Sequence, residues 1–306
     1  ANTVWTTTTT VLTGGQWLVD FPASAFTTNG ALIADGAYSV EVSGTNADGR
    51  SHTNTVSLTI QTTLPTVSLS GLSINGNNLL TESGNRVLKD VDYTRLLGTD
   101  GTTGGNDDLP LIISGTASVS ANDQTLTLRL NNQTYPATIA NGAWSVSIPS
   151  ATAQALVHGN TYPISLSTTD AYGNASAATS VNLLINRATP DTPTVTPLLT
   201  NDSTPLISGS AAKLILGSSP AAYEALVSGD IINVRLVSTG APTSYSFTVG
   251  DSTPNVISYN ATAKTWQLAV PNSLTAGTYN VEVTVTSGNV VKTDISSGEL
   301  VIDLTA

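Results

Sequence analysis

Residues 142–148 read GAWSVSI, a stretch in which apolar side chains alternate with small polar ones around Trp144. Such alternation is typical of a β-strand with one face buried and the other in water. Tryptophan stretches of the same kind occupy residues 15–19 (GQWLV) and 266–270 (WQLAV). The interval from Trp17 to Trp144 is nearly equal to the interval from Trp144 to Trp266. Each interval has the length of a whole domain and is far too long for one solenoid coil or propeller blade.

A second motif follows each tryptophan stretch, with a glycine and a tyrosine just before another alternating strand. It occupies residues 35–42 (DGAYSVEV), 158–166 (HGNTYPISL) and 274–283 (LTAGTYNVEV). A further phrase is shared by residues 109–117 (LPLIISGTA) and 204–211 (TPLISGSA), and it indicates an early strand of the later repeats. We expect the tryptophans and tyrosines of these motifs to lie in domain cores.

Extended stretches that contain proline, at residues 62–65 and 188–193, are typical of linkers because proline interrupts regular structure. The sequence therefore predicts a partial domain at residues 1–63, a second domain at 64–188 and a third at 189–306. Domains of this size with short alternating strands predict an all-β fold. We expect tandem immunoglobulin-like β-sandwich domains in an extended rod.

Three features depart from a uniform array. The second domain carries a polar insert at residues 82–106, and the third carries an additional stretch at residues 213–223. Both decorations could carry ligand contacts. The segment before Trp17 is several times shorter than the segment from Pro65 to Trp144, so the front half of the first domain is missing. Two explanations stay open, since either the chain was cut inside a domain or another chain supplies the missing strands.

The composition excludes several classes of function. Apolar residues make up 40% of the chain, enough for cores, and charged residues only 10%. The chain has no cysteine, which excludes disulfides, cysteine-based metal sites and a cysteine nucleophile. With 10 basic against 21 acidic residues, it would repel nucleic acids and anionic lipids, so nucleic acid is not an expected partner. No apolar run is long enough for membrane insertion.

The sequence offers little for catalysis. A Ser–His–Asp relay would need one of the two histidines, His52 or His158, beside a nucleophile, and His158 lies in a turn before a glycine. Glycoside hydrolysis would need two carboxylates facing a sugar groove, and the nearest acidic pairs lie in polar loops. These pairs are Asp90 with Asp92 and Asp107 with Asp108. We therefore predict that the chain is not an enzyme.

Together, the motifs resemble the bacterial immunoglobulin-like repeats of giant adhesins that Gram-negative bacteria, Salmonella among them, export by type I secretion. The resemblance rests on the linker TPDTP (189–193), the SGTA and SGSA phrases, the tryptophan and tyrosine strands, and DAYGN (170–174). It implies a secreted, extracellular chain at the bacterial surface, with a role in cell adhesion, biofilm and virulence. It also implies that neighbouring repeats of the chain contact each other and bind calcium at their joints.

The acidic residues fit the expectation of calcium sites. Of the 21 acidic residues, 16 are aspartates, a bias expected when carboxylates lie in turns or coordinate a hard cation. For the joint between the second and third domains we expect three carboxylates to converge: Asp170, Asp191 and Asp202. The joint between the first and second domains offers three others: Asp48, Asp107 and Asp108. Backbone carbonyls and water would complete either calcium shell.

Two functions from different classes follow. The first is a structural and adhesive segment, in which calcium-stiffened repeats mediate or present attachment to a host-cell surface or a glycan receptor. The alternative is a carbohydrate-binding or accessory β-sandwich module of a secreted enzyme. A cadherin-like receptor would also lack cysteine, but its linker motif Asp-x-Asn-Asp-Asn-x-Pro is absent from the chain.

Overall fold

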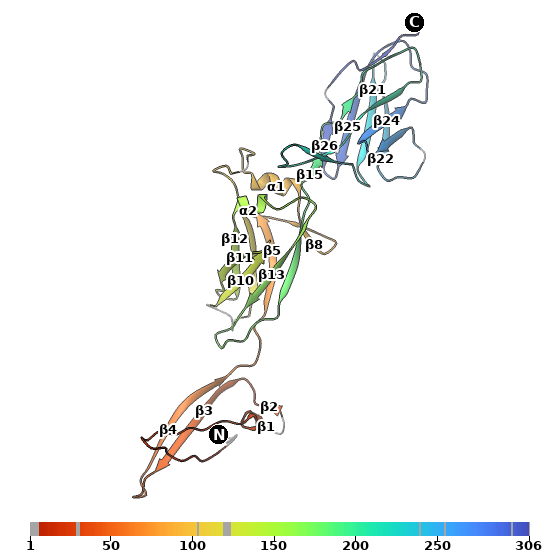
Figure 1. Cartoon of the computed structure of the whole chain (residues 1–306). Helices are drawn as coiled ribbons and strands as arrows, with labels where there is room; N and C mark the ends of the chain where they lie inside the picture. The colour runs from red at the N-terminus through yellow and green to blue at the C-terminus, as the bar shows by residue number, and fades with distance from the viewer. Residues whose placement is uncertain are drawn as a thin grey trace.

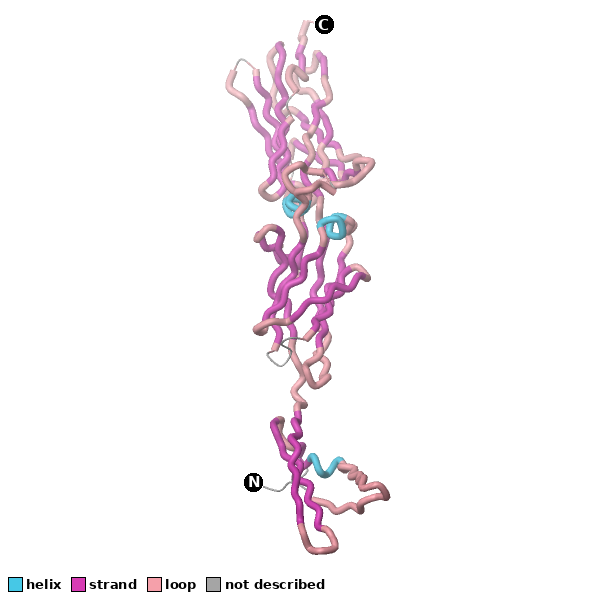
Figure 2. The backbone as a smooth tube through the Cα atoms, turned by 90° about the vertical axis from the view of Figure 1, so that its left-hand side faces the viewer, coloured by secondary structure: helices cyan, strands magenta, loops and turns pink. Residues whose placement is uncertain are grey.

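The chain forms three β-rich units that follow one another along one axis, with the C-terminus at the far end of the third (Figures 1 and 2). The computed structural model describes residues 6–28, 31–102, 104–118, 124–238, 240–253, 255–294 and 296–305. Strands account for 49% of the structure and helices for 5%, which confirms the predicted all-β fold. We call the connection between the first and second units the first joint, and that between the second and third units the second joint.

The second unit is a sandwich of two sheets. One sheet has the order β12 (Ala143–Ile148), β9 (Leu111–Ala117), β5 (Val67–Ile74) and β6 (Asn77–Asn78). The other has the order β11 (Gln133–Thr138), β10 (Thr125–Leu130), β13 (Thr161–Thr168), β14 (Thr179–Ile185), β8 (Asn85–Leu88) and β7 (Leu80–Glu82). Two short helices, α1 (Asp90–Leu96) and α2 (Ser150–Gln154), lie at the end that faces the third unit (Figure 1). In the described part of the chain no helix is long and apolar enough to span a bilayer.

The third unit repeats this plan. Its first sheet has the order β16 (Thr194–Val195), β18 (Leu206–Ser210), β24 (Thr265–Ala269) and β23 (Ile257–Asn260). Its second sheet has the order β17 (Leu198–Thr200), β27 (Leu300–Ile302), β25 (Gly277–Ser287, which also pairs with β26, Val290–Thr293), β21 (Ile231–Val237) and β22 (Thr243–Thr248). The parallel pair β17 and β27 corresponds to the parallel pair β8 and β14 of the second unit. A small third sheet joins β15 (Ala188–Pro190), β19 (Lys213–Ile215) and β20 (Ala222–Glu224).

The tryptophan motif and the shared Ser-Gly phrase are cross-strand partners. Trp144 lies opposite Gly115, and Trp266 lies opposite Gly209. A Cβ atom at Gly115 would be 2.5 Å from the Trp144 ring and closer still to a backbone carbonyl oxygen, so only glycine fits there. Trp144 is 4% exposed and Trp266 is fully buried, as the sequence predicts for both. The repeated phrase therefore provides the space that each core tryptophan needs.

The tyrosine motif fixes the turn that leads into the next strand. The Tyr279 hydroxyl donates to the carbonyl oxygen of Thr275 at 3.0 Å, and the Tyr38 hydroxyl donates to that of Ala34 at 2.7 Å. In the second unit the Tyr162 hydroxyl accepts a hydrogen bond from a turn N–H at 3.0 Å. Such tyrosine corners are typical of immunoglobulin-like sandwiches. The motif thus has the same local role in all three units.

The first unit contains a long hairpin of β3 (Gly36–Thr45) and β4 (Ser51–Ile60), a 3-10 helix (Ala23–Phe26), and the short pair β1 (Thr27–Thr28) and β2 (Ala31–Leu32). Among the described residues the hairpin pairs with no further strand, and the other sheet of the unit is the short β1–β2 pair. Trp17 is consequently 48% exposed and Val56 is 56% exposed. The prediction that the motif tryptophan lies in a core is therefore wrong for Trp17, which lies outside the described strands and has no cross-strand glycine like those of Trp144 and Trp266.

Candidate metal centre beside the second joint

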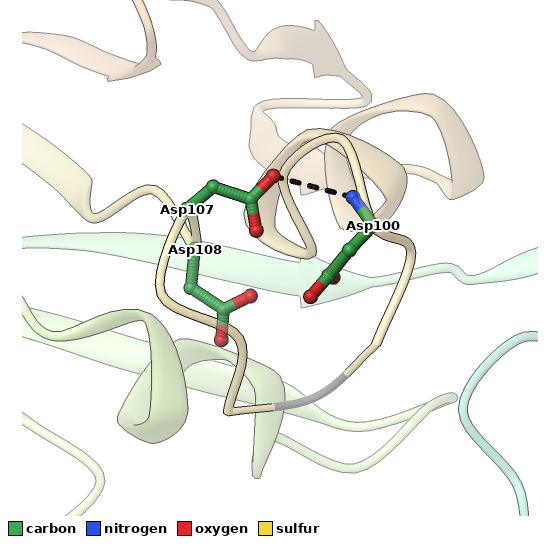
Figure 3. A group of neighbouring side chains, drawn as sticks. All are labelled: Asp100, Asp107 and Asp108. Carbon is green, nitrogen blue, oxygen red and sulfur yellow. Dashed lines mark hydrogen bonds between the residues drawn. The ribbon is translucent and has the colours of Figure 1, made fainter.

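Three aspartates, Asp100, Asp107 and Asp108, lie together in the loop between α1 and β9 (Figure 3). Each offers a carboxylate oxygen, and these oxygens lie within 4.8 Å of one another. The loop is at the end of the second unit, because β9 begins there and runs back toward the first joint. The three carboxylates therefore lie at the end of the unit from which the third unit continues.

Asp107 is held by the backbone on the opposite side of the loop. Its Oδ2 accepts hydrogen bonds from the hydroxyl and N–H of Thr99, and from the N–H of Asp100 at 3.2 Å (Figure 3). The hydroxyl of Thr99 makes the largest contribution, and these bonds hold the pKa of Asp107 below its ordinary value. Asp107 is therefore a carboxylate at neutral pH.

Asp108 has one bonded oxygen and one orphaned oxygen. Its Oδ2 accepts from the N–H of Gly104 at 2.9 Å and from Nε2 of Gln154 at 3.0 Å. Its Oδ1 is buried and has no hydrogen-bond partner. A buried carboxylate oxygen without a partner is costly unless water or an ion satisfies it. The orphaned oxygen is thus an available ligand beside two other carboxylates.

The chemistry of this cluster fits a hard cation. None of the ion pairs between described residues involves Asp100, Asp107 or Asp108, so no basic side chain neutralises their charges. The side-chain atoms that could bind a metal ion are all carboxylate oxygens, which suit calcium and not the softer transition metals. A bound cation would remove the repulsion between the carboxylates and tie Asp100 to the 107–108 segment.

The aspartates predicted to converge at the second joint do not do so. Asp191 lies at the second joint, where its N–H donates to the carbonyl oxygen of Ala212 at 2.9 Å. Asp170 lies at the first joint, in the turn whose Asn174 donates from Nδ2 to the carbonyl oxygen of Gln61 at 3.0 Å. Asp202 follows β17 at the end of the third unit that is remote from the second joint. The predicted three-carboxylate site is therefore wrong.

The set expected at the first joint is also separated. Asp48 lies in the turn at the far tip of the β3–β4 hairpin, one strand length from the joint. Asp107 and Asp108 do come together, but at the opposite end of the second unit and with Asp100, which the sequence did not single out. Both errors have one cause. Each antiparallel strand reverses direction, so successive loops lie at alternate ends of a sandwich.

Asp170 forms a closed turn of its own. Its Oδ1 accepts from the N–H groups of Tyr172 and Asn174, each at 2.9 Å, and its Oδ2 accepts from the Asn174 side chain at 3.0 Å. Burial by itself would raise the pKa of Asp170, but these hydrogen bonds together lower it below the ordinary value. The carboxylate thus orders the DAYGN turn that contacts the first joint.

Comparison with known proteins finds solved structures of low identity to this chain. No protein-family model matches the chain, and no curated protein matches it. A solved structure from work on host cell surface retention of a 1.5-MDa bacterial ice-binding adhesin is 17% identical, with a TM-score of 0.36, over 96% of this chain and 82% of that chain. A Ca2+-stabilized adhesin that helps an Antarctic bacterium bind ice is 22% identical, with a TM-score of 0.33, over 97% of this chain and 63% of that chain.

The BSP domain of a biofilm-associated protein is 18% identical, with a TM-score of 0.24, over 64% of this chain and 28% of that chain. This chain therefore spans less than two thirds of the adhesin from the Antarctic bacterium and of the biofilm-associated protein. At these identities the likeness concerns the fold alone.

Proposed function

We propose that this chain is a structural and adhesive segment of a bacterial surface adhesin, extracellular and non-enzymatic. The observation that carries the proposal is the serial arrangement in Figure 2, in which two sandwiches with separate cores follow each other and the chain enters and leaves at opposite ends. A chain built in this way holds whatever is attached at one end at a distance from the other end. The host-cell surface or glycan receptor, and the finer likeness to the Salmonella adhesin, are parts of the proposal.

Two of the residues considered for catalysis, Asp92 and His158, have structural partners, which supports a non-enzymatic role. Asp92 accepts from Nη1 of Arg95 at 2.7 Å and from the N–H of Lys89 at 3.1 Å, so it caps helix α1. His158 bonds to Glu224 across the second joint and to the backbone N–H of Arg187. Neither residue is free for substrate.

The carbohydrate-binding alternative would need a platform of exposed aromatic rings. Tyr172 is 58% exposed and Tyr223 is 46% exposed. Tyr172 lies at the first joint and Tyr223 lies in β20 at the second, so they are at opposite ends of the second unit. These two tyrosines therefore cannot belong to one stacking platform.

Calcium at Asp100, Asp107 and Asp108 is the second part of the proposal. The ion would fix the loop that precedes β9, beside the second joint, and millimolar extracellular calcium fills even weak sites. The test is thermal melting and titration calorimetry with calcium and with a chelator. We expect calcium to bind and to raise the melting temperature of the parent, as ligands of the native state do. The variant Asp107→Asn with Asp108→Asn should lose both effects, whereas the matched variant Asp191→Asn with Asp202→Asn should keep them.

Small-angle scattering tests the serial arrangement separately. Three units in series, built from strands of up to about ten residues at about 3.3 Å per residue, give an expected maximum dimension of about 100 Å. A maximum dimension no longer than two such units would mean that the units fold back on each other, and it would reject the spacer role. Identical melting in calcium and chelator would instead reject the ion and leave the array in place.

A further inference from the structure

The two segments that depart from a uniform repeat meet at the second joint. The third unit's extra stretch forms the ribbon of β19 and β20, and β19 also pairs with the linker strand β15. The buried ion pair of Lys213 Nζ with Asp230 Oδ2, at 3.0 Å, ties this ribbon to the third unit. The second unit's insert contains α1, which lies beside β15, where its Tyr93 ring contacts Arg187 (Figure 1). The linker is thus a paired strand and not a free extended segment.

The tip of the ribbon packs into the second unit. Leu216, which follows β19, packs against the hydrophobic core of the second unit. Gly217 adopts a φ of +71°, and a Cβ atom there would overlap the hydroxyl of Tyr93. Tyr93 itself is buried, on α1. Apolar burial therefore spans the joint.

Arg187 contacts the second unit on one side and the tip of the ribbon on the other. It is 8% exposed, and its guanidinium carbon lies 4.6 Å from the centroid of the Tyr93 ring. Its Nη1 donates to the carbonyl oxygen of Gln154 at 3.2 Å, and its own carbonyl oxygen accepts from the N–H of Leu216 at 3.2 Å. One residue therefore contacts both helices of the second unit and the tip of the ribbon.

His158 adds a second connection. Its Nδ1 accepts from the N–H of Arg187 at 3.0 Å, which places the ring proton of a neutral imidazole on Nε2. Nε2 lies 3.0 Å from Oε2 of Glu224, on the ribbon strand β20, and donates to it. Both ring nitrogens are thus used, one toward the linker and one toward the third unit.

We propose that Arg187 and the β19–β20 ribbon form a clamp that holds the second and third units in one orientation without a metal ion. Among the described residues no carboxylate pairs with Arg187. The Tyr93 ring and the carbonyl oxygen of Gln154, both in the second unit, offset the cost of burying its charge. The hydrogen bond from Leu216 is the contact that exists only when the units are docked. Arg187 is accordingly a positioning residue for the joint. This goes beyond the adhesive role, which requires units in series but not a fixed angle.

Distance measurements between spin labels test the clamp in the full chain. The chain has no cysteine, so Ser147→Cys on β12 and Gln267→Cys on β24, both exposed, give one label in each unit. In chelator we expect one narrow distance distribution for the parent. Arg187→Ala should lose it, whereas Arg129→Ala, at an exposed position of β10, should keep it.

Leu216→Ser is a second variant, at a position outside the strands of both sandwiches. It tests the clamp if Arg187→Ala does not fold. It should also lose the narrow distribution while both sandwiches retain their melting transitions. A residue that only stabilised the second unit would lower its melting temperature and leave the distances unchanged. A parent that is narrow in calcium and broad in chelator, or a Leu216→Ser variant that stays narrow, overturns the clamp.

Discussion

The first unit and the third unit carry the same tryptophan and tyrosine motifs, yet only the third encloses a core around them. Trp266 is fully buried against Gly209 of β18, whereas Trp17 is 48% exposed and the described part of its unit has no equivalent of β18. The tyrosine corner, by contrast, forms in both units, because its hydrogen bond joins residues close together in sequence. Local motifs thus form locally, and burial depends on a strand from the other half of a sandwich.

The largest expected difference between the units concerns the tryptophans. Trp266→Ala should destabilise the third unit by about 3 to 5 kcal/mol, the usual cost of deleting a buried aromatic side chain. Trp17→Ala should cost close to nothing, since that side chain is half exposed. Chemical denaturation of the two full-length variants measures both values. Equal losses of stability would mean that Trp17 is covered in solution.

The glycine opposite the tryptophan should be the next most sensitive position. In Gly209→Ala, the new Cβ would be 2.8 Å from Nε1 of Trp266 and closer to the carbonyl oxygen of Thr194, to which that nitrogen donates at 3.1 Å. Overpacking of this kind costs about 1 to 3 kcal/mol. Gly240→Ala in the same unit and Gly44→Ala in β3 are the controls, because nothing lies within 4 Å of a Cβ atom at either position. A Gly209→Ala variant as stable as these controls would contradict the cross-strand pairing.

Many of the strands can be predicted from sequence periodicity. The contacts at the joints cannot. Alternation around Trp144 and Trp266 predicts their strands and their burial, and the shared Ser-Gly phrase predicts a further strand. Which end of a sandwich a loop occupies depends on the number of strand reversals before it, and for this reason the sequence predicts Asp170 and Asp107 at the wrong joints. The contact of Leu216 with the other unit's core has no periodic signal, because it depends on how two separately folded units meet.

Removing the hydroxyl of the tyrosine corner should change stability less than the tryptophan and glycine substitutions do. In Tyr279→Phe the bonds to the carbonyl oxygen of Thr275, at 3.0 Å, and to its hydroxyl, at 3.1 Å, are lost in a mostly buried setting. A single neutral hydrogen bond contributes about 0.5 to 1.5 kcal/mol. Tyr38→Phe removes the equivalent bond to Ala34 where water can replace it, so the loss there should be smaller. Thermal melting of the two variants compares them, and a larger loss for Tyr38→Phe would show that the first unit relies on its corner more than the third does.

The smallest expected effect on stability is that of low pH on Asp35, at the end of the first unit that faces the first joint. Both oxygens of Asp35 accept bonds from the linker: the Thr62 hydroxyl and N–H reach Oδ1 at 2.6 and 2.7 Å, and those of Thr63 reach Oδ2 at 2.7 and 3.0 Å. These bonds, the Thr62 hydroxyl first, hold the pKa of Asp35 far below its ordinary value. The matching turn before β25 has Ala276 in place of an acid.

Because the native pKa of Asp35 is lowered, its stabilising contribution is complete above the unfolded value of about 3.9 and is lost as the pH falls through the native pKa. Carbon-13 NMR of the Asp35 carboxyl should therefore give a midpoint well below that value, with the Thr62 and Thr63 amide shifts moving together with it. In Asp35→Asn those amide shifts should not respond to acid, while amides in the third unit titrate as in the parent. A midpoint near the ordinary value for aspartate would mean that the linker is not held by Asp35.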